Sequence, residues 1–137
     1  MFSKYAHSLL VALFFATSAY GQNLVDSAQE LPGVWAGDAS WGDYDNDGDL
    51  DLALMGEVFE DGQAQRVVRL FGNEEALLFE DLAVSQQIVG VYHGALAWGD
   101  YDGDGDLDLA VAGWDVSDSE SLSLYKNDFV SRTLQQD

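Results

Sequence analysis

Two nearly identical stretches dominate the sequence: WGDYDNDGDLDLALMG at residues 41–56 and WGDYDGDGDLDLAVAG at residues 98–113. Each places five aspartates at alternate positions and then continues directly into an apolar segment. The aspartates are Asp43, Asp45, Asp47, Asp49 and Asp51 in the first stretch, and Asp100, Asp102, Asp104, Asp106 and Asp108 in the second. Carboxylates at this density repel one another, so each stretch favours a bound cation beside a buried strand.

The composition supports this interpretation. The chain has 137 residues, enough for one ordinary domain, and 47% of them are hydrophobic, as in globular proteins. Its formal net charge is −20, so nucleic acid and anionic membrane surfaces would be repelled. The clustering of the acidic residues favours a metal or a basic partner surface over an acidic surface that serves only solubility.

Cysteine and histidine usage narrows the kind of metal site. The chain has no cysteine, which excludes disulfides, thiolate metal sites and a lipid anchor on cysteine. Its two histidines, His7 and His93, are too few for a histidine-rich zinc site.

Residues 1–21 have the pattern of a secretory signal peptide. Lys4 precedes an apolar run at residues 9–16, and cleavage is expected after Gly21 or after Ala19. The run is shorter than the roughly 20 residues that span a bilayer. We therefore expect a mature chain, residues 22–137, without a membrane span. It is expected to be secreted or at the cell surface, with the periplasm as an alternative.

The two stretches belong to longer repeats. Residues 31–45 align with residues 88–102 at an offset of 57 residues, and RLFGNE from Arg69 resembles LYKND from Leu124 at an offset of 54. The first copy therefore holds three extra residues, which we place in a loop, EVFEDGQAQ, at residues 57–65.

Alternating hydrophobicity predicts short strands within each repeat. Leu50, Leu52 and Leu54 alternate with smaller or polar residues, and further strands are expected at RVVRLF, SLSLY and LLFEDL. No amphipathic helix is expected. Four short strands per repeat are typical of a β-propeller blade. The predicted fold is all-β, with two four-stranded antiparallel blades of a propeller type that form an incomplete ring.

The spacing within each acidic loop indicates calcium. With Asp43 or Asp100 as position 1, carboxylates occupy positions 1, 3, 5, 7 and 9, and a glycine at position 6 permits a sharp turn. Calcium takes about 6–8 oxygen ligands, so about one ion per repeat is expected. Position 12 is Leu54 or Val111 rather than the glutamate of an EF-hand, so position 9 must supply the closing carboxylate. Magnesium and an acidic turn without an ion are the alternatives.

Both stretches resemble the FG-GAP repeat, called the VCBS repeat in bacteria, and the segment LFGNE to VYHG resembles the link between such repeats. The resemblance covers about residues 24–127 and implies a calcium-binding β-propeller like that of integrin α-chain heads. It implies side-chain ligands at positions 1, 3, 5 and 9 and a backbone carbonyl ligand at position 7. The implied side-chain ligands are Asp43, Asp45, Asp47 and Asp51, then Asp100, Asp102, Asp104 and Asp108; Asp49 and Asp106 would bind through their carbonyls.

The number of repeats in this chain differs from the number found in this family. Propellers close with typically 4–8 blades, so two repeats cannot close a ring. The family would continue into a linking strand after LYKND, where this chain reads FVSRTLQQD and ends. We expect either a truncated relative or a protein that completes its ring by self-association.

Aromatic residues suggest where partners bind. Trp41 and Trp98 occupy equivalent positions and are expected to pack between blades. Trp35 and Tyr92 flank glycines and are better candidates for a surface contact, including a glycan contact. His93 has no histidine counterpart in the first repeat and is expected to be an ordinary side chain.

The sequence gives little support for an enzyme. No Ser-His-Asp arrangement can be assembled, and carboxylates repeated in the same role fit metal binding better than paired acid and base catalysis. The expected function is a secreted calcium-binding adhesion or protein-interaction module with an unknown protein or glycan partner. The alternatives are a carbohydrate-binding or accessory propeller module of a secreted hydrolase, or a fragment of a longer propeller.

Overall fold

The computed structural model describes residues 26–128 and 133–136, so the predicted signal segment, residues 1–21, lies outside the described residues. The described chain forms two antiparallel sheets, each with its four strands in chain order. Sheet 1 contains β1 (Trp35–Gly42), β2 (Asp51–Glu60), β3 (Gln63–Glu74) and β4 (Leu77–Glu80). Sheet 2 contains β5 (Tyr92–Gly99), β6 (Asp108–Trp114), β7 (Glu120–Asp128) and β8 (Thr133–Gln136).

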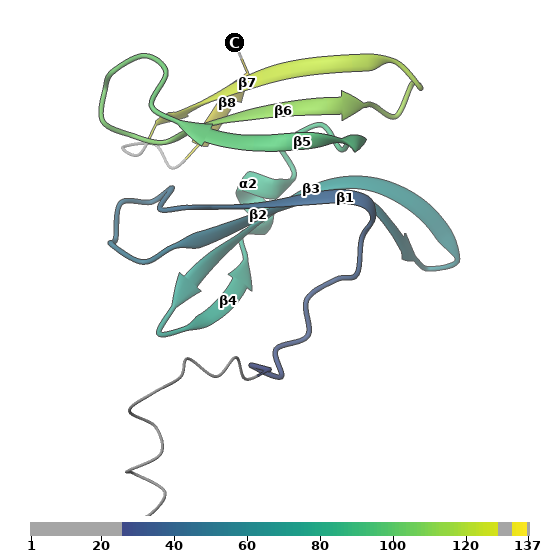
Figure 1. Ribbon diagram of the computed structural model, residues 1–137, viewed down its shortest axis with the longest axis horizontal. Coiled ribbons are helices and arrows are strands. Elements are labelled where there is room, and N and C mark those ends of the chain that lie inside the picture. The colour runs from purple at the N-terminus through teal and green to yellow at the C-terminus, as the bar shows by residue number, and fades with distance from the viewer. Residues whose placement is uncertain (1–25, 129–132, 137) are drawn as a thin grey trace, which may run out of the picture.

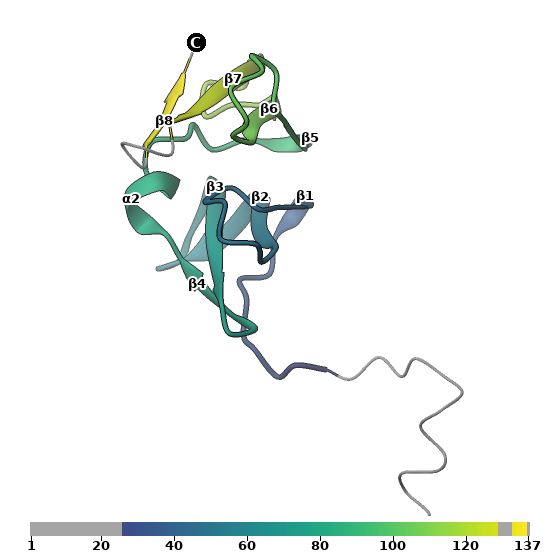
Figure 2. The same cartoon turned by 90° about the vertical axis from the view of Figure 1, so that its left-hand side faces the viewer.

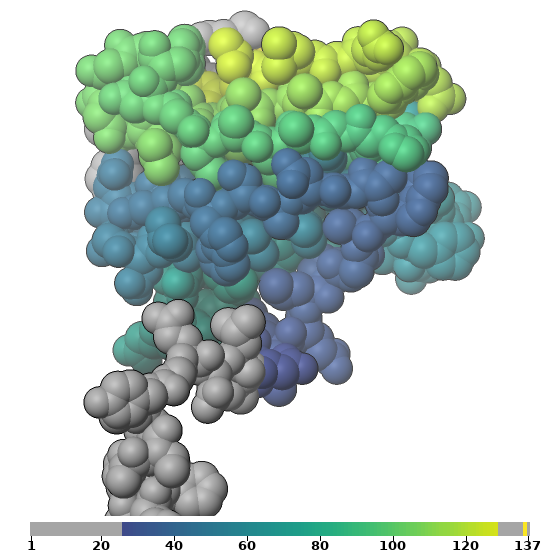
Figure 3. All heavy atoms as spheres, viewed as in Figure 1, coloured from purple at the N-terminus to yellow at the C-terminus, as the bar shows by residue number. Residues whose placement is uncertain are grey.

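The sheets stack face to face, and a single helical turn, α2 (Leu82–Ser85), lies on the segment that joins them (Figures 1 and 2). The space-filling view shows two layers in contact along their length (Figure 3). The prediction of an all-β fold with two antiparallel sheets is confirmed, and within the described ranges the sheets do not close into a barrel. No helix in those ranges has the length and hydropathy needed to cross a bilayer.

The main hydrophobic core lies between the sheets. Because side chains of a strand alternate between faces, β2 sends Ala53 and Met55 into this core and Leu52 and Leu54 to the opposite face of sheet 1. The opposite face carries a smaller cluster in which Phe71 joins the two leucines. Sheet 1 is therefore apolar on both faces.

The segment predicted as the loop EVFEDGQAQ is a continuous β-hairpin. Asp61 and Gly62 both have positive φ, 52° and 78°, which is the backbone of a tight type I′ turn. On either side the strands stay in register out to the pair Glu60 and Gln63. The loop prediction was wrong because the Asp-Gly turn needs just two residues, which leaves the flanking polar residues free to pair as strands.

The sequence predicted four strands per repeat, but it did not locate the helical turn α2 or the last strand of the second repeat. The turn α2 begins after Asp81, whose carboxylate accepts a hydrogen bond from the N–H of Val84, an N-cap arrangement that stabilises very short helices. The segment after LYKND does contain a strand, β8, which pairs with β7 through Thr133–Gln136. The second repeat therefore has four strands like the first.

A bulge recurs at the start of both repeats. The register of β1 shifts between Trp35 and Asp38, and that of β5 shifts in the same way. Ala36 and His93 occupy equivalent positions there, with φ of 48° and 49°. A Cβ on the following Gly37 would lie 2.2 Å from the carbonyl oxygen of Met55, so this position accepts glycine alone.

Candidate metal centres

The two acidic loops connect β1 to β2 and β5 to β6, and they lie beside each other. The side-chain amide of Asn46 in the first loop donates a hydrogen bond of 2.7 Å to Oδ1 of Asp106 in the second. Each loop leads into a central strand of its sheet, so the loop is attached to a rigid support. This arrangement suits binding of ligands because the scaffold fixes the ends of the loop.

In each loop the carboxylates at positions 1, 3 and 9 converge. One oxygen from each of these three residues lies within 4.8 Å of the others. The two groups are Asp43, Asp45 and Asp51, and Asp100, Asp102 and Asp108. Calcium binds oxygen at 2.3–2.6 Å, so ligands on opposite sides of one ion are about 5 Å apart. The spread of the carboxylates therefore matches a shared hard cation.

The carboxylate at position 9 is buried and held by two backbone N–H groups. Asp51 is 1% exposed, and its oxygens accept hydrogen bonds from Tyr44 N at 3.0 Å and Asn73 N at 2.8 Å. Burial raises the pKa of Asp51, while the two N–H donors act in the opposite direction.

The second loop repeats this anchor. Asp108 is 3% exposed and accepts hydrogen bonds from Tyr101 N at 3.1 Å and Asn127 N at 2.8 Å. Position 9 therefore ties each loop to the first residue of a central strand and to the third strand of the same sheet. These contacts hold one carboxylate of each converging group in place.

The carboxylate at position 1 organises the turn. Asp43 accepts hydrogen bonds from Asp47 N at 3.0 Å and Gly48 N at 3.1 Å. The glycine at position 6 has φ of 98° in the first loop and 99° at Gly105 in the second, so both loops turn through the same left-handed residue. The prediction that glycine makes this turn is confirmed.

The structure leaves two predicted ligand positions outside the converging groups. At position 5, Asp47 accepts a hydrogen bond of 2.8 Å from Asp49 N, and Asp104 accepts one of 3.0 Å from Asp106 N. Neither carboxylate belongs to the sets that lie within 4.8 Å. Ligation by position 5 and by the carbonyls of Asp49 and Asp106 stays a prediction.

A lysine distinguishes the second loop from the first. The ammonium group of Lys126 in β7 pairs with Oδ2 of Asp102 and lies 3.1 Å from Oδ2 of Asp104. These contacts, led by Asp102, raise the pKa of the lysine, and the lysine contributes to a lowered pKa of Asp104 after the Asp106 N–H. The counterpart of Lys126 in the first repeat is Gly72, which offers no ammonium group.

Tyr44, at position 2 of the first loop, links this loop to sheet 2. Its ring stacks on Trp98 with a centroid distance of 6.2 Å and an interplanar angle of 12°. Its hydroxyl donates to Asp81 at 3.1 Å, and burial together with Asp81 raises the pKa of the phenol. The first loop is thus part of the contact between the sheets.

A second group of polar and aromatic residues lies at the other ends of the strands. Trp35 is 61% exposed, and its ring centroid lies 6.2 Å from that of Tyr92 and 5.1 Å from that of His93. The guanidinium of Arg66 lies 4.2 Å from the centroid of the Tyr92 ring and forms an ion pair with Asp118 at 2.5 Å. The prediction that Trp35 is available for a surface contact agrees with this exposure.

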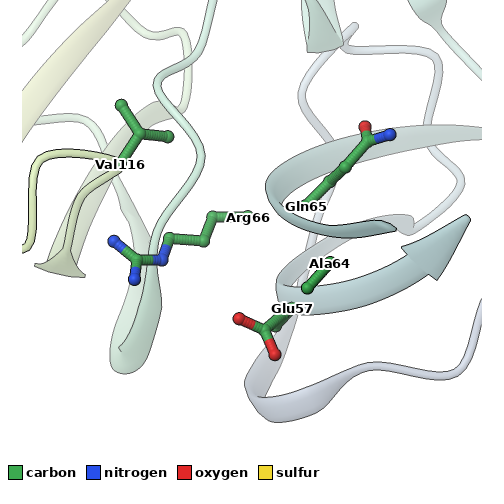
Figure 4. A pocket seen from close by; sticks show the side chains of 5 residues that line it. All are labelled: Glu57, Ala64, Gln65, Arg66 and Val116. Atoms are coloured by element: carbon green, nitrogen blue, oxygen red, sulfur yellow. The ribbon is translucent and has the colours of Figure 1, made fainter. Parts of the chain in front are cut away.

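An open pocket of about 570 Å³ adjoins this aromatic group. Figure 4 shows the Arg66 side chain reaching into it between Glu57 and Val116, while Ala64 and Gln65 complete the lining. The pocket brings a carboxylate and a guanidinium near exposed aromatic rings. This combination suits a polar ligand with apolar ring faces, such as a sugar.

Sequence reasoning missed the residues that support the loops. The repeat alignment could have indicated Lys126, because it places this lysine of LYKND opposite Gly72 of RLFGNE. The alignment of RLFGNE with LYKND places Asn73 opposite Asn127, but the role of their backbone N–H groups as donors to the position-9 carboxylates depends on strand register, which the sequence does not supply.

Trp41 and Trp98 do not share one environment. Trp98 packs against the core between the sheets, as predicted, whereas Trp41 is 55% exposed. The prediction for Trp41 was wrong because it assumed a neighbouring sheet on both sides of sheet 1.

Comparison with family models, with curated proteins and with solved structures finds no match to this chain.

Proposed function

We propose that this is an exported, calcium-binding repeat protein without enzymatic activity, built from two FG-GAP/VCBS-type propeller blades and used in adhesion or protein interaction. One observation carries the proposal: two loops gather the same three carboxylates with a spacing that suits calcium. The repeated loop sequences and the two stacked four-stranded sheets support it further.

The chain's own residues define what each loop does. Asp51 and Asp108 are fixed by backbone N–H groups, and Asp43 holds the turn through two further N–H groups. Calcium supplies the positive charge that neutralises the carboxylates and joins the loop to its strand. Because the two loops repeat one arrangement, they fit a structural role better than distinct acid and base roles.

Isothermal titration calorimetry of the purified protein tests this function. We expect about one calcium ion per repeat and much weaker binding of magnesium, which requires stricter octahedral geometry. The double variant Asp43→Asn with Asp100→Asn should lose binding. Glu74→Gln with Glu120→Gln, which removes the same charge from exposed positions outside the loops, should retain it. Absence of calcium binding at millimolar concentration would contradict the proposal.

Glycan binding is the second candidate function. It is favoured by the exposed Trp35 beside Tyr92 and His93 and by the pocket that contains Glu57 and Arg66. Sugars bind proteins by stacking their apolar faces on aromatic rings while polar side chains bind the hydroxyls.

A glycan array separates the two candidates. Retention of a glycan by the protein and its loss in Trp35→Ala, with Phe59→Ala as an exposed aromatic control, would support a lectin. Absence of any retained glycan would contradict this second candidate and leave the calcium proposal unaffected.

A further inference from the structure

The interface between the sheets joins two different faces of the repeat. Sheet 1 contributes Ala53, Met55, Val68 and Leu70, whereas sheet 2 contributes Leu96, Leu109, Val111 and Tyr125. The counterparts of Leu109, Val111 and Tyr125 in the first repeat are Leu52, Leu54 and Phe71, which lie on the opposite face of sheet 1. The packing is therefore directional.

Each repeat accordingly has two named faces. The head face is the one with which sheet 2 contacts sheet 1. The equivalent face of sheet 1 comprises Trp41, Leu52, Leu54 and Phe71, with Arg69 opposite Leu54 and ion-paired with Glu60 and Glu80. The tail face is the one that sheet 1 turns toward sheet 2, and in sheet 2 it comprises Ala110, Ala112, Leu122 and Leu124. The described chain joins one tail to one head. The other tail is exposed; on the other head Trp41 is exposed, whereas Leu52, Leu54 and Phe71 are 5–8% exposed with Val34 and Leu78 packed against them.

The open tail face keeps the apolar character of the covered one. Val68 is 3% exposed within the interface, and its counterpart Leu122 is 73% exposed. Leu70 is 0% exposed, and its counterpart Leu124 is 38% exposed. Covering leucines at these positions is favourable by roughly 25 cal/mol for each Å² of apolar surface removed from water.

The aromatic contact across the interface also has an exposed counterpart. Trp98 on the head of sheet 2 stacks on Tyr44 and donates its indole N–H to the carbonyl oxygen of Ser40 at 3.4 Å. The counterparts of this pair are Trp41 and Tyr101, which are 55% and 47% exposed. If the tail face of another sheet packed on sheet 1 in the same geometry, the indole N–H of Trp41 would meet the backbone carbonyl of Ala97 in that sheet, the counterpart of Ser40. The replacement of serine by alanine does not remove this backbone acceptor.

We propose that the head face of sheet 1 takes the tail face of sheet 2 of a second copy of this chain, in the geometry with which sheet 1 already packs on sheet 2. The internal interface provides the argument for this occupant, since it shows that one tail and one head of this repeat are complementary. Such a head-to-tail contact is heterologous, and it closes into a ring or extends as a filament. The inference does not rest on calcium binding.

Sedimentation velocity of the purified protein, at about 0.15 M salt to screen its charge, tests the proposal. Two variants each break one side: Leu122→Asp on the tail and Trp41→Asp on the head, both at exposed positions so that the single chain keeps its fold. Phe59→Asp is the matched control, because Phe59 is 76% exposed at the tip of the β2–β3 hairpin, outside both faces.

We expect the wild type and Phe59→Asp to associate beyond a dimer as concentration rises, and each face variant alone to remain monomeric. An equal mixture of the two face variants should form a discrete dimer and nothing larger, because each retains one intact face. Circular dichroism of each variant, unchanged from wild type, excludes unfolding as the cause.

Two outcomes would overturn the proposal. A wild type that remains monomeric at the highest soluble concentration would show that the faces await a different partner. Face variants that fail to pair when mixed would show that the contact is not head to tail. Neither result would affect the calcium proposal, which the calorimetric titration measures separately.

Discussion

The first and second acidic loops have a similar backbone conformation but differ in the nearest positive charge. In both, the position-9 carboxylate accepts two backbone N–H groups, and the glycine at position 6 has nearly the same φ. In the second loop Lys126 contacts two of the carboxylates, whereas the first repeat has Gly72 at that position. The shared part forms the proposed cation site, and we expect the difference to set how strongly each loop attracts a cation.

Removal of the position-9 carboxylate should have the largest effect on stability, and the loss should be the same for the two loops. Asp51→Ala or Asp108→Ala leaves two partly or fully buried N–H groups without an acceptor, so we expect a loss of about 2–6 kcal/mol in the free energy of unfolding. Urea unfolding in the presence of chelator measures this without any contribution from calcium. A loss in one loop alone would break the similarity between the loops.

Chelation of calcium should destabilise the fold next most strongly. A ligand at 100 times its dissociation constant stabilises the folded state by about 2.7 kcal/mol for each site. Thermal unfolding with calcium and with chelator measures the difference. In Asp43→Asn the difference should fall to the contribution of the second loop, and an unchanged difference would contradict the assignment of Asp43.

The position-5 carboxylates test whether the two loops bind independently. Asp47→Ala and Asp104→Ala should each abolish calcium binding at their own loop and leave the other largely intact, because each carboxylate belongs to one loop. Calorimetry should then give about one ion per chain. Unchanged stoichiometry would show that position 5 is not a ligand.

Exchanging the lysine should give the smallest effect and sharpen the comparison most. Lys126→Gly should strengthen calcium binding at the second loop roughly three- to tenfold, since an exposed ammonium group competes weakly for the carboxylates. Gly72→Lys should weaken the first loop by a similar factor, and its Cβ has room because the nearest atom, the Tyr44 hydroxyl, is 3.7 Å away.

Lys126→Arg, which keeps the charge, is the control and should bind calcium like the wild type. If neither exchange changes affinity, the lysine is a surface ion pair without influence on the site. Calorimetry in the Asp43→Asn background isolates the second loop for this measurement.

The sequence predicted the features that depend on nearby residues. The alternation of leucines with small residues predicted the central strands, and the repeat offset predicted two equivalent sheets. Of the predicted ligand positions 1, 3, 5, 7 and 9, the structure groups the carboxylates at 1, 3 and 9, because all three belong to one short loop and the strand that follows it.

Features that depend on contacts between distant segments were missed. The strand β8 has a weak sequence pattern and forms through its backbone pairing with β7. The exposure of Trp41 depends on which faces of the sheets meet, and the contact of Lys126 with Asp102 depends on the register of β7. Short-range periodicity carries no information on either point.

The hairpin between β2 and β3 has a consequence for how this repeat tolerates changes in length. The pairs Glu57–Arg66 and Trp114–Glu120 are equivalent, and beyond them the first repeat has eight residues and the second has five. An odd insertion inside a strand would turn every later side chain to the opposite face. At this tip the extra residues leave each ligand and core position in place, so the tip offers a site for grafting a peptide or epitope.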